Sequence, residues 1–235
     1  MEFERALVAF AHPDDAEFLC GGTVALWAGE GTKVSYVCVT DGSAGWNGPD
    51  LSREEIAVKR EEEMRSVAEL MGVADVRFLG YTDGMLEPTL DLRRDLTREV
   101  RRRRPDVIVA PDPSMLWSGR SYINHPDHRA VGEAMLAVVA CDAPTRPQFP
   151  ELIEEGFEPY KARRLWLAAG DGEGDRLVDI SGTIELKIKA LAAHRSQVQN
   201  MDLEVDETLR EWARKQATGG GFEYGERFRT FEIEI

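Results

Sequence analysis

The chain has 235 residues, of which 43% are hydrophobic and 31% are charged, as in ordinary globular proteins and unlike collagenous, disordered or disulfide-rich chains. It carries 29 Lys and Arg residues against 43 Asp and Glu residues, a formal net charge of −14. Such a field repels phosphate backbones and anionic lipid, so neither nucleic acid nor a membrane is expected as a partner. A chain of this length builds a core without a metal or disulfide, so any metal would serve chemistry.

The cysteines and the N-terminus bear on the compartment. Cys20, Cys38 and Cys141 form no CxxC pair and are odd in number, which favours a reducing compartment with buried thiols. No stretch approaches the ~18 consecutive apolar residues of a membrane span, and no basic region followed by an apolar one opens the chain. We therefore expect a cytoplasmic protein, folded as one domain over residues 1–235.

Apolar runs of strand length alternate with stretches of helical periodicity over the first 140 residues. We expect strands at 6–11, 34–40, 76–79 and 107–110, and helices at 21–28, 52–71, 91–104 and 126–139. The capping box Ser52-x-x-Glu55 opens the second of these helices, and Pro105 ends the third. This alternation predicts an α/β fold with a Rossmann-like, mainly parallel sheet flanked by helices.

The last third of the sequence is less regular. Residues 143–160 hold four prolines, and short strands are expected at 165–168 and 177–180, with helices at 184–193 and 205–217. Residues 231–235 alternate apolar and charged, which predicts a half-exposed edge strand guarded by carboxylates. The run Arg101 to Arg104 is interpreted as a solvated helix end whose cations complement the helix dipole.

Two short motifs lie where chemistry is expected, at the carboxyl ends of strands. The first strand leads into His12-Pro-Asp-Asp15, and the loop after the fourth leads into His125-Pro-Asp-His128, with Pro126 suited to the first helical position. Three of the four histidines of the chain lie in these motifs. A lone histidine is usually structural, but this pairing indicates a metal site. Nitrogen and oxygen ligands with one open position are typical of catalytic zinc.

On these two motifs the chain resembles the zinc-dependent de-N-acetylases of the LmbE-like or PIG-L-like type, which hydrolyse N-acetylglucosamine conjugates. Further stretches that resemble the family follow in the expected order: Thr40-Asp41-Gly42, Arg60-x-x-Glu63 with Met71-Gly-Val73, Asp83-Gly84-x-Leu86, His194-Arg-Ser-Gln197 and Tyr224-Gly-Glu226-x-Phe228. The resemblance implies that His12, Asp15 and His128 are zinc ligands and that Asp14 is the general base.

Two further residues of the second motif, His125 and Asp127, are candidates for catalytic and orienting roles. His125 is our candidate for the donor to the oxyanion or for the acid that protonates the leaving amine. Asp127 could hold an imidazole in one tautomer, or it could be a helix-start carboxylate favoured by the dipole alone.

Arg60 falls on the buried side of its helix, where a cation needs a partner. Either Glu63 pairs with it or its stem snorkels, whereas the resemblance favours a role in binding substrate hydroxyls, shared with Asp83. Trp46 and Trp117 are candidate stacking platforms for a sugar or simple loop anchors.

Together these features predict a zinc-dependent hydrolase that removes an N-acetyl or N-acyl group from a small amino sugar or N-acetylglucosamine conjugate by metal-activated water. One alternative is an amidase of the same site chemistry that cleaves a thiol-sugar conjugate or another amide. A second is a Rossmann-like binding module without catalysis, against which stands the lack of a glycine-rich phosphate loop after the first strand. The sugar, the aglycone and the oligomeric state, a homo-oligomer included, stay open.

Overall fold

The computed structural model of the chain describes residues 2–46, 48–120, 122–168, 174–199 and 204–234. Its centre is a seven-stranded sheet of order β3-β2-β1-β4-β7-β9-β8. The strands are β1 (Arg5–Phe10), β2 (Lys33–Thr40), β3 (Asp75–Tyr81), β4 (Val107–Pro111), β7 (Arg164–Ala168), β8 (Arg176–Asp179) and β9 (Gly225–Glu232). Neighbouring strands from β3 to β7 run parallel, and β9 is antiparallel to both β7 and β8.

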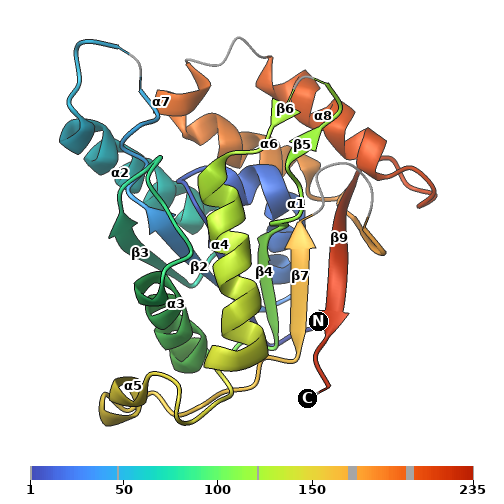
Figure 1. Cartoon of the computed structure of the whole chain (residues 1–235). Helices are drawn as coiled ribbons and strands as arrows, with labels where there is room; N and C mark the ends of the chain where they lie inside the picture. The colour runs from blue at the N-terminus through green and yellow to red at the C-terminus, as the bar shows by residue number, and fades with distance from the viewer. Residues whose placement is uncertain (1, 47, 121, 169–173, 200–203, 235) are drawn as a thin grey trace.

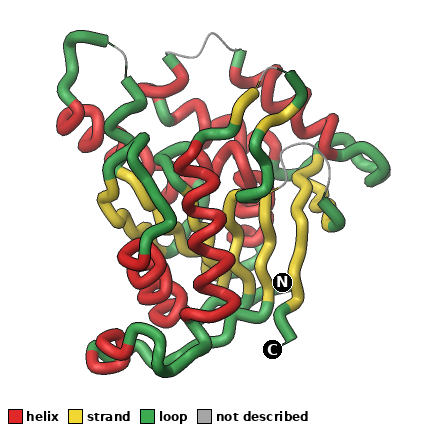
Figure 2. Tube along the Cα trace, viewed as in Figure 1, coloured by secondary structure: helices red, strands yellow, loops and turns green. Residues whose placement is uncertain are grey.

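Helices cover both faces of this sheet (Figures 1 and 2). They are α1 (Asp15–Gly29), α2 (Arg53–Leu70), α3 (Leu90–Arg103), α4 (Pro126–Ala137), the π-helical segment η1 (Val138–Asp142), α5 (Pro150–Glu154), α6 (Ile184–Ala193), α7 (Arg195–Val198) and α8 (Val205–Gln216). One apolar core joins the sheet to α1, α2 and α6, and a second joins its other face to α3, α4 and η1. The predicted α/β class and mainly parallel sheet are confirmed.

The start of one helix agrees with the prediction from its cap, and the start of another lies earlier than expected. Ser52 caps α2, and both hydrogen bonds of the predicted capping box form. By contrast, α1 begins at Asp15, six residues before the expected start, and is kinked at Cys20, whose φ/ψ of −150° and 20° are not helical. The expected helix at 21–28 therefore corresponds to the part of α1 that follows the kink.

The solvated helix end expected at Arg101 to Arg104 is wrong for Arg101. This side chain is 2% exposed, and its Nε and Nη2 groups donate to the backbone carbonyls of Asp142, Ala143, Thr145 and Gln148. Because α3 packs against η1, Arg101 supplies hydrogen-bond donors to backbone carbonyls at the end of η1 and in the segment that follows it.

The edge strand expected at 231–235 is corrected in extent, because β9 begins at Gly225 and ends at Glu232. Its residues 225–228 pair with β8, and its residues 228–232 pair with β7. From Arg229 onward the strand is therefore paired on one side, as an alternation of apolar and charged residues predicts for an edge.

The carboxyl ends of the parallel strands meet at one end of the molecule, the top in Figure 1. A small antiparallel hairpin of β5 (Trp117–Ser118) and β6 (Tyr122–Ile123) lies at the same end, between β4 and α4 in the chain. The fold therefore brings both histidine motifs to this end. Among the helices that the structure describes, none is long and apolar enough to cross a membrane.

Candidate functional site

The turn from β1 into α1 forms one wall of the site. The Asp15 carboxylate accepts hydrogen bonds through Oδ2 from the backbone amides of Ala11 (3.1 Å) and His12 (2.8 Å). Asp14, between them and the helix, has a φ of 119°, a region that residues with a Cβ rarely adopt. Strain of this kind persists where the surroundings hold it, often at functional sites. The tight turn lets His12, Asp14 and Asp15 share one small space.

The second wall is the start of α4. Pro126 occupies the first turn, and His125 is the N-cap residue. The amide of Asp127 donates to Nδ1 of His125 at 3.2 Å. This cap places His128 one turn into the helix, with its ring facing the β1–α1 turn.

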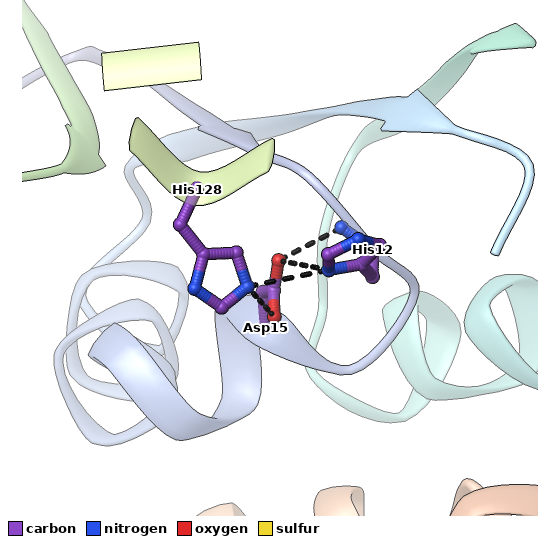
Figure 3. Close-up of side chains that lie close together, drawn as sticks. All are labelled: His12, Asp15 and His128. Atoms are coloured by element: carbon purple, nitrogen blue, oxygen red, sulfur yellow. Dashed lines mark hydrogen bonds and ion pairs between the residues drawn. The ribbon is translucent and has the colours of Figure 1, made fainter. Parts of the chain in front are cut away.

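Three predicted ligands converge between these walls. Nε2 of His128 lies 3.2 Å from Nδ1 of His12 and 3.0 Å from Oδ1 of Asp15, and Nδ1 of His12 lies 3.4 Å from Oδ2 of Asp15. Figure 3 shows the three side chains pointing toward one another. All their donor atoms lie within 4.8 Å of one another, which suits a single metal ion.

The far nitrogen of His12 shows which side of its ring can bind a cation. Nε2 of His12 lies 3.1 Å from Oδ1 of Asp83 and 3.3 Å from Oδ2 of Asp127, and ionised carboxylates only accept hydrogen bonds. The proton of the neutral ring therefore sits on Nε2, and the lone pair of Nδ1 faces His128. Two nitrogen lone pairs and a carboxylate repel one another unless a positive charge lies among them.

The local electrostatics favour that positive charge. Burial lowers the pKa of His12, but the charge of Asp15 and the hydrogen bonds that the ring donates to Asp127, Asp15 and Asp83 raise it by more, so the pKa lies well above its usual value. Burial raises the pKa of Asp15, and the neighbouring rings of His128 and His12 lower it well below its usual range. The site thus stabilises a cation, either a proton on the rings or a metal ion.

Asp14 lies beside the ligands in a different environment. Its Oδ1 is 3.3 Å from Nη2 of Arg60, and among the described residues neither candidate ligand group includes it. Burial raises the pKa of Asp14 to about 6, against the opposing charge of Arg60. A carboxylate with a raised pKa that binds no metal is suited to accept a proton.

Arg60 is buried, as its helical position predicts, with 3% of its surface exposed. It donates to the carbonyls of Pro13 (2.7 Å) and Gly42 (2.8 Å). The alternative in which Glu63 pairs with it is wrong, because Glu63 accepts hydrogen bonds from the amide and hydroxyl of Ser196. Arg60 therefore ties the β1–α1 turn to the loop after β2.

Asp83 and Asp127 both face His12. Oδ2 of Asp83 also accepts from the amide of Ala44 at 3.0 Å and lies 3.7 Å from Nη1 of Arg60. Asp127 accepts from the amides of Gly84 (2.8 Å) and Leu86 (3.3 Å). Asp127 is therefore more than a dipole partner of α4, since it binds both His12 and the loop after β3.

His125 lies at the rim. Its ring packs edge-on against His12, with centroids 4.6 Å apart, and its side chain is 41% exposed. Burial and the nearby rings of His12 and His128 lower its pKa. Because Nδ1 accepts the amide of Asp127, the neutral ring carries its proton on Nε2. His12, His125 and Asp127 form a second group that could hold an ion, but there His12 offers a proton rather than a lone pair.

Sequence reasoning missed one neighbour of the ligands and left two indoles unassigned. Asn124 contacts Nδ1 of His128 at 3.0 Å, and its position directly before the His125-x-x-His128 motif is the signal that could have found it. Trp46 donates to Asp50, as a loop anchor would, whereas Trp117 is 63% exposed.

Comparisons with known proteins identify the relatives of this chain. The family model described as PIG-L, GlcNAc-PI de-N-acetylase, matches residues 7–139. The chain is 31% identical over 198 residues to the diacetylchitobiose deacetylase of Thermococcus kodakarensis, covering 83% of this chain and 71% of that protein. It is 33% identical over 202 residues to a probable N-acetyl-alpha-D-glucosaminyl L-malate deacetylase 2 of Bacillus cereus, covering 84% and 85%. The solved N,N'-diacetylchitobiose deacetylase of Pyrococcus horikoshii superimposes with a TM-score of 0.89 at 33% identity, covering 98% of this chain and 85% of that one.

Proposed function

Because the chain belongs to the PIG-L family of de-N-acetylases and is therefore a hydrolase, we propose that it removes the acetyl group from a small N-acetylated amino sugar with the help of one zinc ion. The proposal rests on the convergence of Nδ1 of His12, Nε2 of His128 and the Asp15 carboxylate. This two-histidine, one-carboxylate set is typical of catalytic zinc. A zinc ion bound there would polarise the amide carbonyl and lower the pKa of a water molecule.

Asp14 is the general base in this proposal. Its carboxylate lies next to the ligands, is held by Arg60 and has its pKa raised to about 6 by burial. At neutral pH it is ionised yet basic enough to take a proton from the attacking water. The reaction consumes one water and breaks the amide C–N bond, which yields acetate and a free amine.

His125 is the donor to the developing oxyanion. Its Nδ1 is occupied by the amide of Asp127, so Nε2–H is the hydrogen-bond donor that its exposed edge can offer to a carbonyl oxygen. The lowered pKa keeps the ring neutral at working pH. A donor positioned in this way needs no reorganisation during the reaction.

Asp127 and Asp83 hold His12 through Nε2, which keeps its Nδ1 lone pair toward the ligand position. Arg60 and Asp83 are also our candidates for binding sugar hydroxyls.

The substrate we propose contains a 2-acetamido-2-deoxyglucose unit. The relatives are named for diacetylchitobiose, for an N-acetyl-alpha-D-glucosaminyl L-malate and for a 1D-myo-inositol 2-acetamido-2-deoxy-alpha-D-glucopyranoside. These compounds share that unit and differ in the group attached to it. We therefore assign the acetamido sugar to the site described above and leave the attached group to be found by experiment.

The test is acetate release from a panel of these compounds and free N-acetylglucosamine, with the zinc-loaded protein. Asp14→Asn serves as the matched control, because it keeps the size of the side chain but cannot accept the proton. We expect acetate from at least one compound and a far lower rate with the variant. A protein that holds one zinc but releases acetate from none of them would favour an amidase for another amide. A protein that holds no zinc would favour a binding module.

A further inference from the structure

Asn124 lies between β6 and α4, directly before the histidine motif, and is 3% exposed. Its backbone amide donates to the carbonyl of Leu116 at 2.9 Å. Its side-chain Nδ2 donates to the carbonyl of Met115 at 2.7 Å. Both bonds tie the residue to the segment that enters the β5–β6 hairpin, so the orientation of its side chain is set by the backbone.

These contacts determine which way the amide of Asn124 faces. A backbone carbonyl only accepts hydrogen bonds, so the NH₂ group must face Met115 and the side-chain oxygen must face the opposite way. There Oδ1 lies 3.2 Å from the hydroxyl of Tyr122, which donates to it. It also lies 3.0 Å from Nδ1 of His128.

The oxygen of Asn124 in turn determines the tautomer of His128. Because Oδ1 can only accept, Nδ1 of His128 must carry a proton, and in the neutral ring Nε2 keeps its lone pair. That lone pair faces Asp15 and His12, at 3.0 and 3.2 Å. The opposite tautomer would place a proton at the ligand position and leave two acceptors facing each other.

We propose that Asn124 is a positioning residue, which holds the proton of His128 on Nδ1 and thereby keeps Nε2 free to bind the metal ion. The inference rests on the proposed metal site. It differs from the arrangement at His12, where carboxylates accept from the far nitrogen. A neutral amide orients His128 without adding another negative charge to a site that already holds Asp14, Asp15, Asp83 and Asp127.

The first measurement uses the unaltered protein without metal. Two-bond ¹H–¹⁵N correlation spectra report which ring nitrogen of a histidine carries the proton, and the chain has only 4 histidines to assign. We expect the neutral ring of His128 to carry its proton on Nδ1, and to lose this preference in Asn124→Ala. A wild-type ring protonated on Nε2 would overturn the proposal without any variant having to fold.

The second measurement is zinc affinity, by competition with a chromogenic chelator. Asn124→Ala should bind zinc about 10–100-fold more weakly, the usual effect of removing a residue that orients a ligand. Asn124→Asp keeps an acceptor for His128 but loses the donor to Met115, so its affinity should match or exceed that of the wild type. Tyr122→Phe is the matched control, because it removes the hydroxyl and leaves the amide in place.

The outcomes separate the explanations. Equal losses in Asn124→Ala and Asn124→Asp would mean that the bond to Met115 matters and that Asn124 is merely structural. Wild-type zinc affinity in Asn124→Ala would likewise overturn the proposal. If the wild type binds no zinc at all, the proposed function fails, while the tautomer measurement still decides the role of Asn124. Thermal unfolding of the metal-free variants shows whether each is folded.

Discussion

The two ring nitrogens of His12 face different groups, and these groups determine which nitrogen carries the proton. Nε2 lies between the carboxylates of Asp83 and Asp127, and Nδ1 faces Asp15 and His128. Carboxylates on one side hold the proton there and leave the lone pair on the other side for a cation. Removing a ligand should therefore affect metal binding first.

We expect His12→Ala, Asp15→Ala and His128→Ala each to lose bound zinc and activity while the metal-free proteins stay folded. The reason is that the two apolar cores do not depend on the ion. Zinc content after dialysis and thermal unfolding by circular dichroism test this. Full zinc content in all three variants would show that these residues are not the zinc ligands.

Asp14→Asn separates the base from the ligands. The variant keeps the hydrogen-bonding size of the side chain but cannot accept a proton, so turnover should fall by about 10²-fold or more. Zinc content should stay at the wild-type level, because Asp14 faces Arg60. An empty site in this variant would exchange the roles of Asp14 and Asp15.

His125→Ala tests the oxyanion donor. A donor used mainly in the transition state should lower kcat and kcat/KM by similar factors, with KM and zinc content nearly unchanged. The expected loss is about 2.7–4 kcal/mol of transition-state stabilisation, as for other single donors. Steady-state kinetics check this, and normal turnover would make His125 only the N-cap of α4.

Among the secondary-structure elements, α3 shows that a run of arginines can include a side chain that is buried in the protein interior. Arg101 is buried against the segment after η1, whereas the side chain of Arg102, the next residue, is 42% exposed and pairs with Asp75 and Glu99. The two arginines of one helix therefore differ in what they contribute to stability, although the sequence presents them as equivalent.

Arg101→Met should destabilise the fold by at least about 1–3 kcal/mol, the cost of leaving one buried polar group unsatisfied. Arg102→Met is the matched control on the same helix, and an exposed ion pair should cost no more than about 1 kcal/mol. Urea unfolding of the two variants measures the difference. Equal losses would show that the four carbonyls near Arg101 find other donors.

Across the whole molecule, a buried polar cluster joins α1 to the junction of α6 and α7. Nε2 of His194 lies 3.0 Å from Oε2 of Glu17, and both side chains are fully buried. The hydroxyl of Tyr36 donates to the other oxygen of Glu17. Burial lowers the pKa of His194, but the hydrogen bond and charge of Glu17 and the charge of Asp14 raise it more, so the net shift is upward.

This shift predicts a pH dependence of stability. A histidine whose pKa is raised on folding binds its proton more tightly in the folded state. Its contribution is complete below the unfolded pKa of about 6.5 and is lost as pH rises through the folded value. The free energy of unfolding of the wild type should therefore fall toward that of His194→Gln as pH rises above about 6.5. Urea unfolding of both metal-free proteins across this range tests it, and a constant difference between them would contradict the shift.

Local interactions explain what could be predicted from the amino-acid order. The capping box of α2 closes within three residues, and the hydrogen bonds that the amides of Ala11 and His12 donate to Asp15 span four residues or fewer. The N-cap of α4 closes between His125 and Asp127. Each of these interactions joins residues within about one turn of each other. A short stretch of sequence is therefore enough to predict the strands, the helices and the two histidine motifs.

Contacts between residues far apart in the sequence could be identified only from the folded structure. Arg101 meets carbonyls more than 40 positions away, and Asp83 reaches His12 across 71 positions of the chain. The placement of β9 between β7 and β8 likewise follows from sheet order. No window of sequence contains both partners of such a contact, because the order of strands in the sheet brings them together. For the same reason His12, Asp15 and His128 were recognisable as candidate ligands one motif at a time, but the tautomer that each imidazole adopts followed from neighbours that other loops supply.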